Sequence, residues 1–151
     1  HGSYNREQIV YSLGKGSFEK SYTSREGVLH VPERKVDAFF VDVNKDEKDY
    51  SPTTMYDDYA ITQHLFHWQT QARTGTHSAT GKRYVNHESM GYTPLLFLRD
   101  RQKLSNGLTA PFIYAGPMTY QSHYGNKPIS IRWLLKHPLP AKVMPWARRV
   151  G

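Results

Sequence analysis

The hydrophobic and polar positions along the chain form the pattern of short strands separated by turns. Apolar residues alternate with polar ones, or run unbroken for a few positions, between stretches rich in Gly, Pro, Asn and Ser. Segment 35–44 is apolar on both of its alternating faces, so we expect it at the centre of a sheet. The segments predicted as strands are 27–31, 35–44, 64–71, 93–99, 112–115, 118–122 and 128–135.

Turns and short helices are predicted between these strands. Gly-Pro at 116–117 divides two of the strands, and turns are expected at 44–49, 105–107 and 125–126. The predicted helices are 5–13, a segment that starts at Ser51-Pro52, and 80–88, which Thr80 caps and Gly91 ends. We therefore expect a mainly β (α+β) fold, a small barrel-like curled sheet with two or three short helices.

The length and composition suit one compact domain. The chain has 151 residues, and we interpret residues 1–3 as a cloning scar and residues 4–151 as a single domain of a longer protein. It contains no Cys, which excludes disulfides and thiolate chemistry and fits a reducing cytosol. The longest apolar runs, such as 95–98, are too short to cross a membrane. We expect a cytoplasmic protein.

The charge is distributed unevenly along the chain. Residues 1–58 hold 8 Lys or Arg and 11 Asp or Glu, whereas residues 59–151 hold 12 Lys or Arg and only 2 Asp or Glu. Such an excess of positive charge is expected of a surface that binds phosphates. A basic surface that only aids solubility is the alternative, although acidic residues serve that purpose at least as well.

Two groups of residues in the sequence could in principle bind a metal ion. His64 and His67 would share one face of a helix, but on a strand they point to opposite faces, so we expect no metal site there. Asp46-Glu47-Lys48, with Asp37 upstream, matches part of a metal-dependent nuclease signature. The triplet falls in a predicted turn, so the nuclease is the alternative hypothesis. We expect no catalytic residue and no cofactor.

Aromatic, amide and cationic side chains are concentrated between residues 56 and 86. Aromatic rings stack on bases, amides read base edges, and cations neutralise phosphates. Period-two alternation places Phe66 and Trp68 on one face of a strand and His67 and Gln69 on the other, and either face could pack the core. The candidate nucleic-acid-binding residues are Tyr56, Tyr59, His67, Trp68, Gln69, Gln71, Arg73, Lys82, Arg83, Tyr84 and Asn86.

Several segments in one order resemble a bacterial domain of unknown function. This domain occurs at the C-terminus of defence proteins that join a phospholipase-D-type nuclease to a superfamily-two helicase, and beside His-Asn-His nucleases. The resemblance covers most of residues 25–142, and its segments are 49–61, 65–71, 81–87, 106–112, 122–125 and 137–141. It implies a bacterial protein whose partners are nuclease and helicase domains in the same or another chain.

These observations together predict a non-catalytic DNA reader. By analogy with the small barrels that defence proteins of this kind use to recognise modified DNA, its expected ligand is duplex DNA that carries a modified base, with a 5-substituted cytosine as the first choice, displaced into an aromatic pocket. In this hypothesis Tyr56, Tyr59, Trp68 or Tyr84 stacks on the base. The residues expected to read its edge are His67, Gln69, Gln71 and Asn86, and those expected to contact phosphates are Arg73, Lys82 and Arg83. The alternatives are a metal-dependent nuclease and a module that docks on the parent helicase.

Overall fold

The computed structural model describes residues 3–4, 17–18, 27–43, 58–70, 74–100, 112–126 and 128–147. Four of the predicted features lie outside these ranges: the helix at 5–13, the turns at 44–49 and 105–107, and the helix that starts at Ser51-Pro52. All structural statements below concern the described residues.

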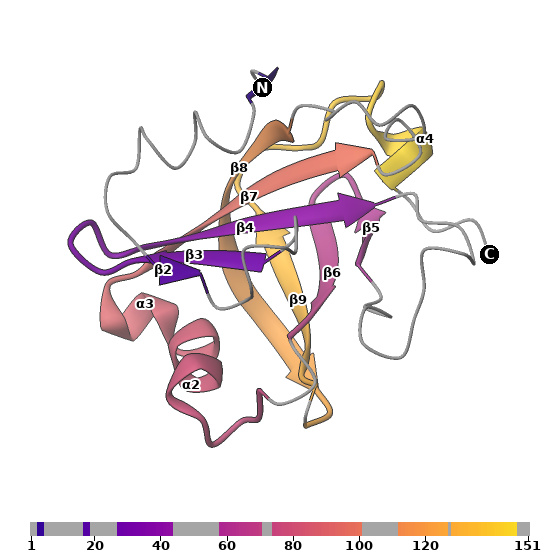
Figure 1. The fold of residues 1–151 in the computed structure, drawn as a ribbon. Helices are drawn as coiled ribbons and strands as arrows, with labels where there is room; N and C mark the ends of the chain where they lie inside the picture. Colours follow the sequence, from indigo (N-terminus) through magenta and orange to yellow (C-terminus); the bar gives the residue numbers. More distant parts are fainter. Residues whose placement is uncertain are drawn as a thin grey trace.

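A single curled sheet forms the body of the molecule (Figure 1). Its strand order is β2-β3-β4-β7-β8-β9-β6-β5, with β1 paired to β8, and the two ends of this order are not joined into a closed barrel. Only the β4–β7 pair among these strands is parallel. The prediction of a mainly β, curled sheet is confirmed. The strands are β1 (Ser3–Tyr4), β2 (Ser17–Phe18), β3 (Gly27–Val31), β4 (Val36–Val43), β5 (Tyr59–Thr62), β6 (Leu65–Gln69), β7 (Thr93–Asp100), β8 (Phe112–Tyr124) and β9 (Ser130–Leu135).

Strand β8 bends the sheet, and here the sequence prediction is wrong. Two strands were expected on either side of Gly116-Pro117, but β8 is one strand of 13 residues. Gly116 has a φ of 99°, and the register shifts beside it and again between Tyr120 and Ser122. A Gly and an irregular register bend a strand without ending it. The strand can therefore pair with β7 and then with β9 (Figure 1).

Four aromatic side chains form the centre of the larger core. Phe39 lies at the middle, with ring centroids 4.7 Å from Trp68, 5.3 Å from Tyr84 and 5.4 Å from Trp133. These residues come from β4, β6, α2 and β9, so the core joins both halves of the curled sheet to the helix. Phe66 belongs to the same core, which means that the Phe66–Trp68 face of β6 points inward.

The opposite face of β4 is buried in a second, smaller core. Ala38 and Phe40 pack there with residues of β3, β7 and β8, and Phe40 stacks on Phe97 at 5.4 Å between ring centroids. Strand β4 is thus covered on both faces, which confirms its predicted central position. The buried members of this second core are Leu29, Val31, Ala38, Phe40, Phe97 and Phe112.

The helices are short, namely α2 (Ala79–Val85), α3 (His87–Met90) and α4 (Met144–Ala147). The predicted helix at 80–88 is divided at Asn86, and its N-cap is Ser78 rather than Thr80. The Ser78 hydroxyl accepts a hydrogen bond from the Gly81 N–H at 3.0 Å, which satisfies a donor that the first helical turn leaves open. No helix among the described residues is long and apolar enough to cross a membrane.

Gly91 ends α3 in the left-handed conformation, as predicted, with a φ of 75°. We expect Gly91→Ala to lower the free energy of unfolding by about 1 kcal/mol, because a Cβ strains this conformation. An added Cβ would meet only the Lys35 side chain, at 3.6 Å or more, so steric overlap adds little. Urea denaturation measures the change, and an unchanged midpoint would contradict this account.

Candidate nucleic-acid interface

The side chains of β5, β6, β9 and β8 that point away from the larger core form one surface. Phe66, Trp68, Ile131 and Trp133 belong to the core, so the residues between them project from the other side of the sheet. Directly paired residues share a face, which adds Tyr59 opposite His67 on β5, and three residues of β8. We call this surface the outer face; it comprises Tyr59, Leu65, His67, Gln69, Thr119, Ser122, Tyr124, Ser130, Arg132 and Leu134.

Two tyrosines and one histidine form an aromatic row on the outer face. The Tyr59 ring stacks on the His67 ring at 4.8 Å between centroids, with 25° between the planes. His67 Nε2 hydrogen-bonds to Tyr124 Oη at 3.1 Å. His67 is buried, whereas Tyr124 is 55% exposed. His67 therefore holds a tyrosine whose ring remains open to a ligand.

Polar and cationic groups flank this aromatic row. The Gln69 side-chain amide donates to Ser130 Oγ at 3.1 Å, and the Gln69 backbone N–H donates to Asp58 Oδ1 at 3.0 Å. Arg132 is exposed and lies directly opposite both His67 and Ser122 in the neighbouring strands. The outer face thus combines an open aromatic ring with a cation, which is the combination that stacks on bases and neutralises phosphates.

Of the predicted site residues that the structure describes, Tyr59, His67 and Gln69 lie together on the outer face. Trp68 and Tyr84 lie in the larger core, with their rings 5.4 Å apart, so neither is placed to stack on a base from the surface. Their burial follows from the alternation of β6 and from the inward side of α2. The predicted residues Tyr56, Gln71 and Arg73 lie outside the described residues.

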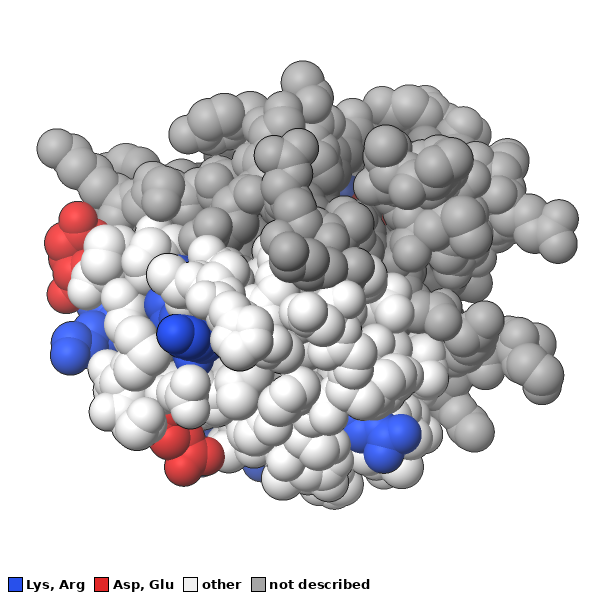
Figure 2. All heavy atoms as spheres, turned by 90° about the horizontal axis from the view of Figure 1, so that it is seen from below, with Lys and Arg blue, Asp and Glu red and all other residues white. Residues whose placement is uncertain are grey.

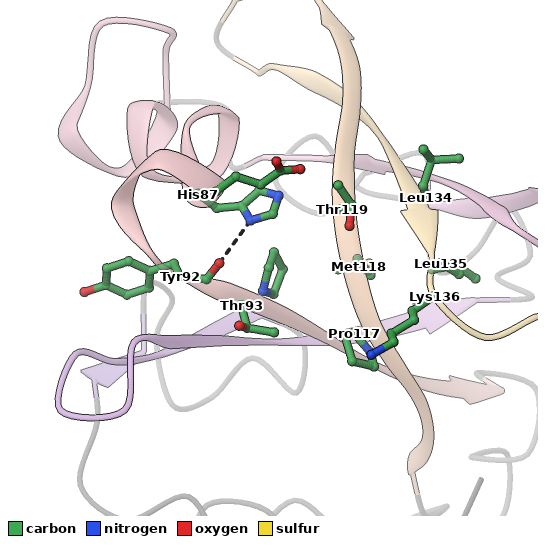
Figure 3. Close-up of a pocket in the computed structure, with 11 residues that line it drawn as sticks. His87, Tyr92, Thr93, Pro117, Met118, Thr119, Leu134, Leu135 and Lys136 are labelled. Carbon is green, nitrogen blue, oxygen red and sulfur yellow. Dashed lines mark hydrogen bonds between the residues drawn. The ribbon is translucent and has the colours of Figure 1, made fainter.

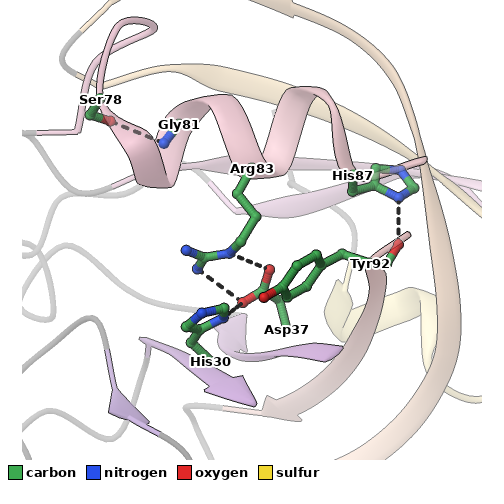
Figure 4. A network of polar contacts seen from close by, with 7 residues as sticks. All are labelled: His30, Asp37, Ser78, Gly81, Arg83, His87 and Tyr92. Atoms are coloured by element: carbon green, nitrogen blue, oxygen red, sulfur yellow. Dashed lines mark hydrogen bonds and ion pairs between the residues drawn. The ribbon is translucent and has the colours of Figure 1, made fainter. Parts of the chain in front are cut away.

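Arg83 takes part in a buried polar network rather than facing solvent (Figure 4). Its guanidinium donates from Nε and Nη2 to Asp37 at 2.8 and 3.0 Å, and His30 Nδ1 lies 3.1 Å from the same carboxylate. His30 stacks on Tyr92 at 5.4 Å between centroids. This network attaches α2 to β3 and β4. Contact between Arg83 and a phosphate, as predicted, would require breaking the ion pair.

Lys82 and Asn86 lie on the exposed side of α2. The Asn86 side-chain amide donates to the Lys82 carbonyl at 3.0 Å, which closes the last turn of the helix. No contact among the described residues joins Lys82 or Asn86 to the aromatic row of the outer face. Lys82 is exposed, and it lies on α2 rather than on the strands that carry Tyr124 and Arg132.

The described structure does not place the residues of the alternative nuclease hypothesis in an arrangement that could bind a metal ion. The Asp37 carboxylate is held by Arg83 and His30, and Asp46 and Lys48 lie outside the described residues. His64 lies in the turn before β6, not in a strand as predicted. Within the described ranges, no group of three or more His, Asp or Glu residues is arranged to hold a metal ion.

A pocket of about 430 Å³ lies across β8 beside the outer face (Figure 3). His87, Tyr92 and Thr93 line one side of it, and Leu134 and Lys136 line the other. Thr119 and Leu134 are paired across β8 and β9, so the pocket adjoins the outer face. Its remaining lining residues are Glu88, Pro94, Pro117, Met118 and Leu135.

The exposed cations of the described residues do not form one continuous patch on the face shown in Figure 2. Arg83 and Arg99 are buried in ion pairs, and the face shown in Figure 2 carries separate basic groups with uncharged surface between them. The expected basic face is therefore not a continuous patch on this side of the described surface. The exposed cations are Arg34, Lys35, Lys82, Arg132, Lys136 and Lys142.

Tyr124 and Arg132 lie on the outer face but were not among the residues predicted from the sequence. Arg132 interrupts the apolar positions Ile131 and Trp133 in a predicted strand, and this alternation was a usable signal for an outward cation. Tyr124 lies 57 positions after its partner His67, so no local pattern predicts their contact.

A comparison with models of protein families assigns the chain to a family. Residues 1–145 match the family described as Domain of unknown function (DUF3427). The chain belongs to this family. A search of curated proteins finds no match. The resemblance noted in the sequence is thus confirmed as membership of an uncharacterised domain family, whose fold here is a curled sheet with an aromatic outer face.

Proposed function

We propose that this DUF3427 domain is a non-catalytic reader of modified duplex DNA that directs a restriction or defence nuclease–helicase to its target. The partner domains, in the same or another chain of a bacterial cytoplasm, would supply the enzymatic activity. The observation that carries the DNA-binding part is the aromatic row Tyr59–His67–Tyr124 beside Arg132 on the outer face.

The arrangement of the row suits a nucleic acid better than a purely structural role. Tyr124 is 55% exposed, so its ring can stack on a ligand, and its hydrogen bond to His67, which itself stacks on Tyr59, reduces its freedom before a ligand arrives. A side chain that is already ordered contributes more to affinity, because less entropy is lost on binding. Arg132 would contact the adjacent phosphate and make the affinity dependent on salt.

Binding of modified and unmodified duplexes in the same salt tests the proposal. We expect a duplex that contains 5-methylcytosine to bind about tenfold more tightly than its unmodified counterpart, the range that one buried methyl group allows. Tyr124→Ala should weaken binding about tenfold or more, because base stacking on an aromatic ring contributes about 1–3 kcal/mol. Fluorescence anisotropy with labelled duplexes measures both effects.

Further variants distinguish the contribution of base stacking to affinity from an effect of the substitution on folding. Tyr124→Phe keeps the ring and removes only the hydroxyl that meets His67, so its affinity should stay within about threefold of the parent value. Arg132→Ala should weaken binding to all duplexes and reduce the salt slope by about one. Equal binding of Tyr124→Ala and the parent chain would remove the outer face from the proposal. Cleavage of plasmid DNA with Mg²⁺ or Mn²⁺ would favour the nuclease instead.

A further inference from the structure

The pocket across β8 has an apolar floor and two oppositely charged ends. Pro94, Pro117 and Met118 supply apolar surface, and the hydroxyls of Thr93 and Thr119 add polar groups. Glu88, on α3, and Lys136, just beyond β9, are both exposed. The backbone N–H of Lys136 donates to the Pro117 carbonyl at 3.0 Å, which fixes the end of β9 against β8.

The two charged side chains lack ionic partners within the described structure. Neither the Glu88 carboxylate nor the Lys136 ammonium forms an ion pair with any residue in the described ranges, and they do not pair with each other. The elements that carry them are attached to different positions of β8: the Lys136 backbone N–H donates to the Pro117 carbonyl, whereas His87, the neighbour of Glu88, accepts from the Tyr120 N–H three positions further along. Three strand residues span about 10 Å. A ligand that carries complementary groups at its two ends would use both charges.

His87 has no free ring nitrogen with which to compete for such a ligand. Its Nε2 accepts a hydrogen bond from the Tyr120 backbone N–H at 2.9 Å, and its Nδ1 donates to the Tyr92 carbonyl at 3.0 Å. These two partners define one neutral tautomer, because an N–H can only donate and a carbonyl can only accept. The imidazole therefore serves as a fixed, flat wall of the pocket (Figure 3).

We propose that this pocket receives a displaced cytosine, with Glu88 accepting a hydrogen bond from the 4-amino group and Lys136 contacting the adjoining phosphate. The inference rests on the proposed DNA-reading function. This proposal assigns the base to the pocket beside the outer face. The sequence had predicted stacking on Tyr56, Tyr59, Trp68 or Tyr84, of which Trp68 and Tyr84 are buried.

Cytosine fits the chemistry of the pocket better than thymine. A carboxylate accepts a hydrogen bond from the amino group of cytosine, whereas thymine presents a carbonyl oxygen at the same position, which a carboxylate repels. The apolar floor suits the carbon edge of the ring, where a 5-substituent projects. The hydroxyls of Thr93 and Thr119 can either donate or accept, so they accommodate the remaining polar atoms of the base.

Duplexes with one unpaired base provide the test. In one duplex a cytosine lies opposite an abasic site, in the second a thymine does, and the third is fully paired. An unpaired base costs less to displace, so the intact domain should bind the cytosine duplex about tenfold more tightly than the paired one. It should also prefer the unpaired cytosine to the unpaired thymine by about tenfold, which is typical of one specific base contact.

Three substitutions localise the effect. Glu88→Ala should abolish the preference for cytosine over thymine, and Thr119→Phe should fill the pocket and abolish the gain from unpairing. Gln121→Phe, at an exposed position of β8 outside the pocket, is the matched control and should behave as the parent chain. Thermal melting of each variant confirms that it is folded.

The outcomes separate the two proposals. Binding of all duplexes with no gain for the unpaired cytosine, or an unchanged preference in folded Glu88→Ala, would overturn the pocket assignment and leave DNA binding by the outer face intact. Failure of the parent chain to bind any duplex at low salt would overturn the proposed function, and the pocket assignment with it.

Discussion

Asp42→Ala should lower the free energy of unfolding by about 3–5 kcal/mol, because it leaves a buried guanidinium without its counter-charge. Arg99 donates to Asp42 from Nε at 2.6 Å and from Nη2 at 2.8 Å, and both side chains are almost fully buried. The Arg99 guanidinium also lies over the Phe112 ring at 4.4 Å, so it cannot turn toward solvent without disturbing the smaller core. Chemical denaturation of the purified chain measures the change.

A double variant distinguishes the cost of an orphaned charge from the value of the pair itself. Asp42→Leu combined with Arg99→Met removes both charges, and we expect it to recover much of the stability that Asp42→Ala loses, since apolar replacements of buried ion pairs are often neutral. Glu33→Ala, on an exposed turn residue, is the control and should change stability by less than about 0.5 kcal/mol. A loss below 1 kcal/mol in Asp42→Ala would contradict the burial of the pair.

Trp68→Ala should lower the free energy of unfolding by about 3–5 kcal/mol, the cost typical of removing a large aromatic side chain from a core. Trp68 contacts the rings of Phe39 and Tyr84 at 4.7 and 5.4 Å between centroids, so its loss leaves a cavity where β4, β6 and α2 meet. The effect on DNA binding should therefore follow unfolding rather than precede it.

Tyr124→Ala is the matched comparison, because it removes an aromatic ring from the opposite face of the same sheet. We expect this variant to stay within about 1 kcal/mol of the parent stability, since Tyr124 is largely exposed and loses one hydrogen bond and one ring contact, both with His67. The two variants together divide the aromatic residues into core and surface. A folded Trp68→Ala domain that binds no DNA would return Trp68 to the binding surface and contradict its structural role.

The alternation of apolar and polar residues along the sequence predicted those features of the strands that depend only on residues adjacent in the chain. Strand β3 has its predicted bounds, and β4 is central because both of its faces are apolar. Alternation also divided β6 correctly into an inward face with Trp68 and an outward face with His67 and Gln69, although it could not say which face is inward. That choice depends on Phe39 and Trp133, which belong to other strands.

Most features that the sequence did not predict depend on contacts between residues that lie far apart in the chain. Arg83 was expected to meet phosphates, but its partner Asp37 lies 46 positions away, and no local pattern joins them. The same holds for Tyr124 and His67, 57 positions apart. Strand β8 was divided at Gly116-Pro117 because these residues usually end strands, whereas pairing with β7 and β9 carries the strand through the bend.

The parallel β4–β7 pair has a consequence for how the chain folds. Val36 pairs with Thr93, so the two strands meet only after the intervening chain, with β5, β6, α2 and α3, has been synthesised. Pairing over such a separation is slow, because a long loop must close before any contact forms. Until then β4 exposes apolar residues on both faces, the condition that favours aggregation of folding intermediates. We therefore expect the nascent domain to be most prone to aggregation in the interval between synthesis of β4 and arrival of β7.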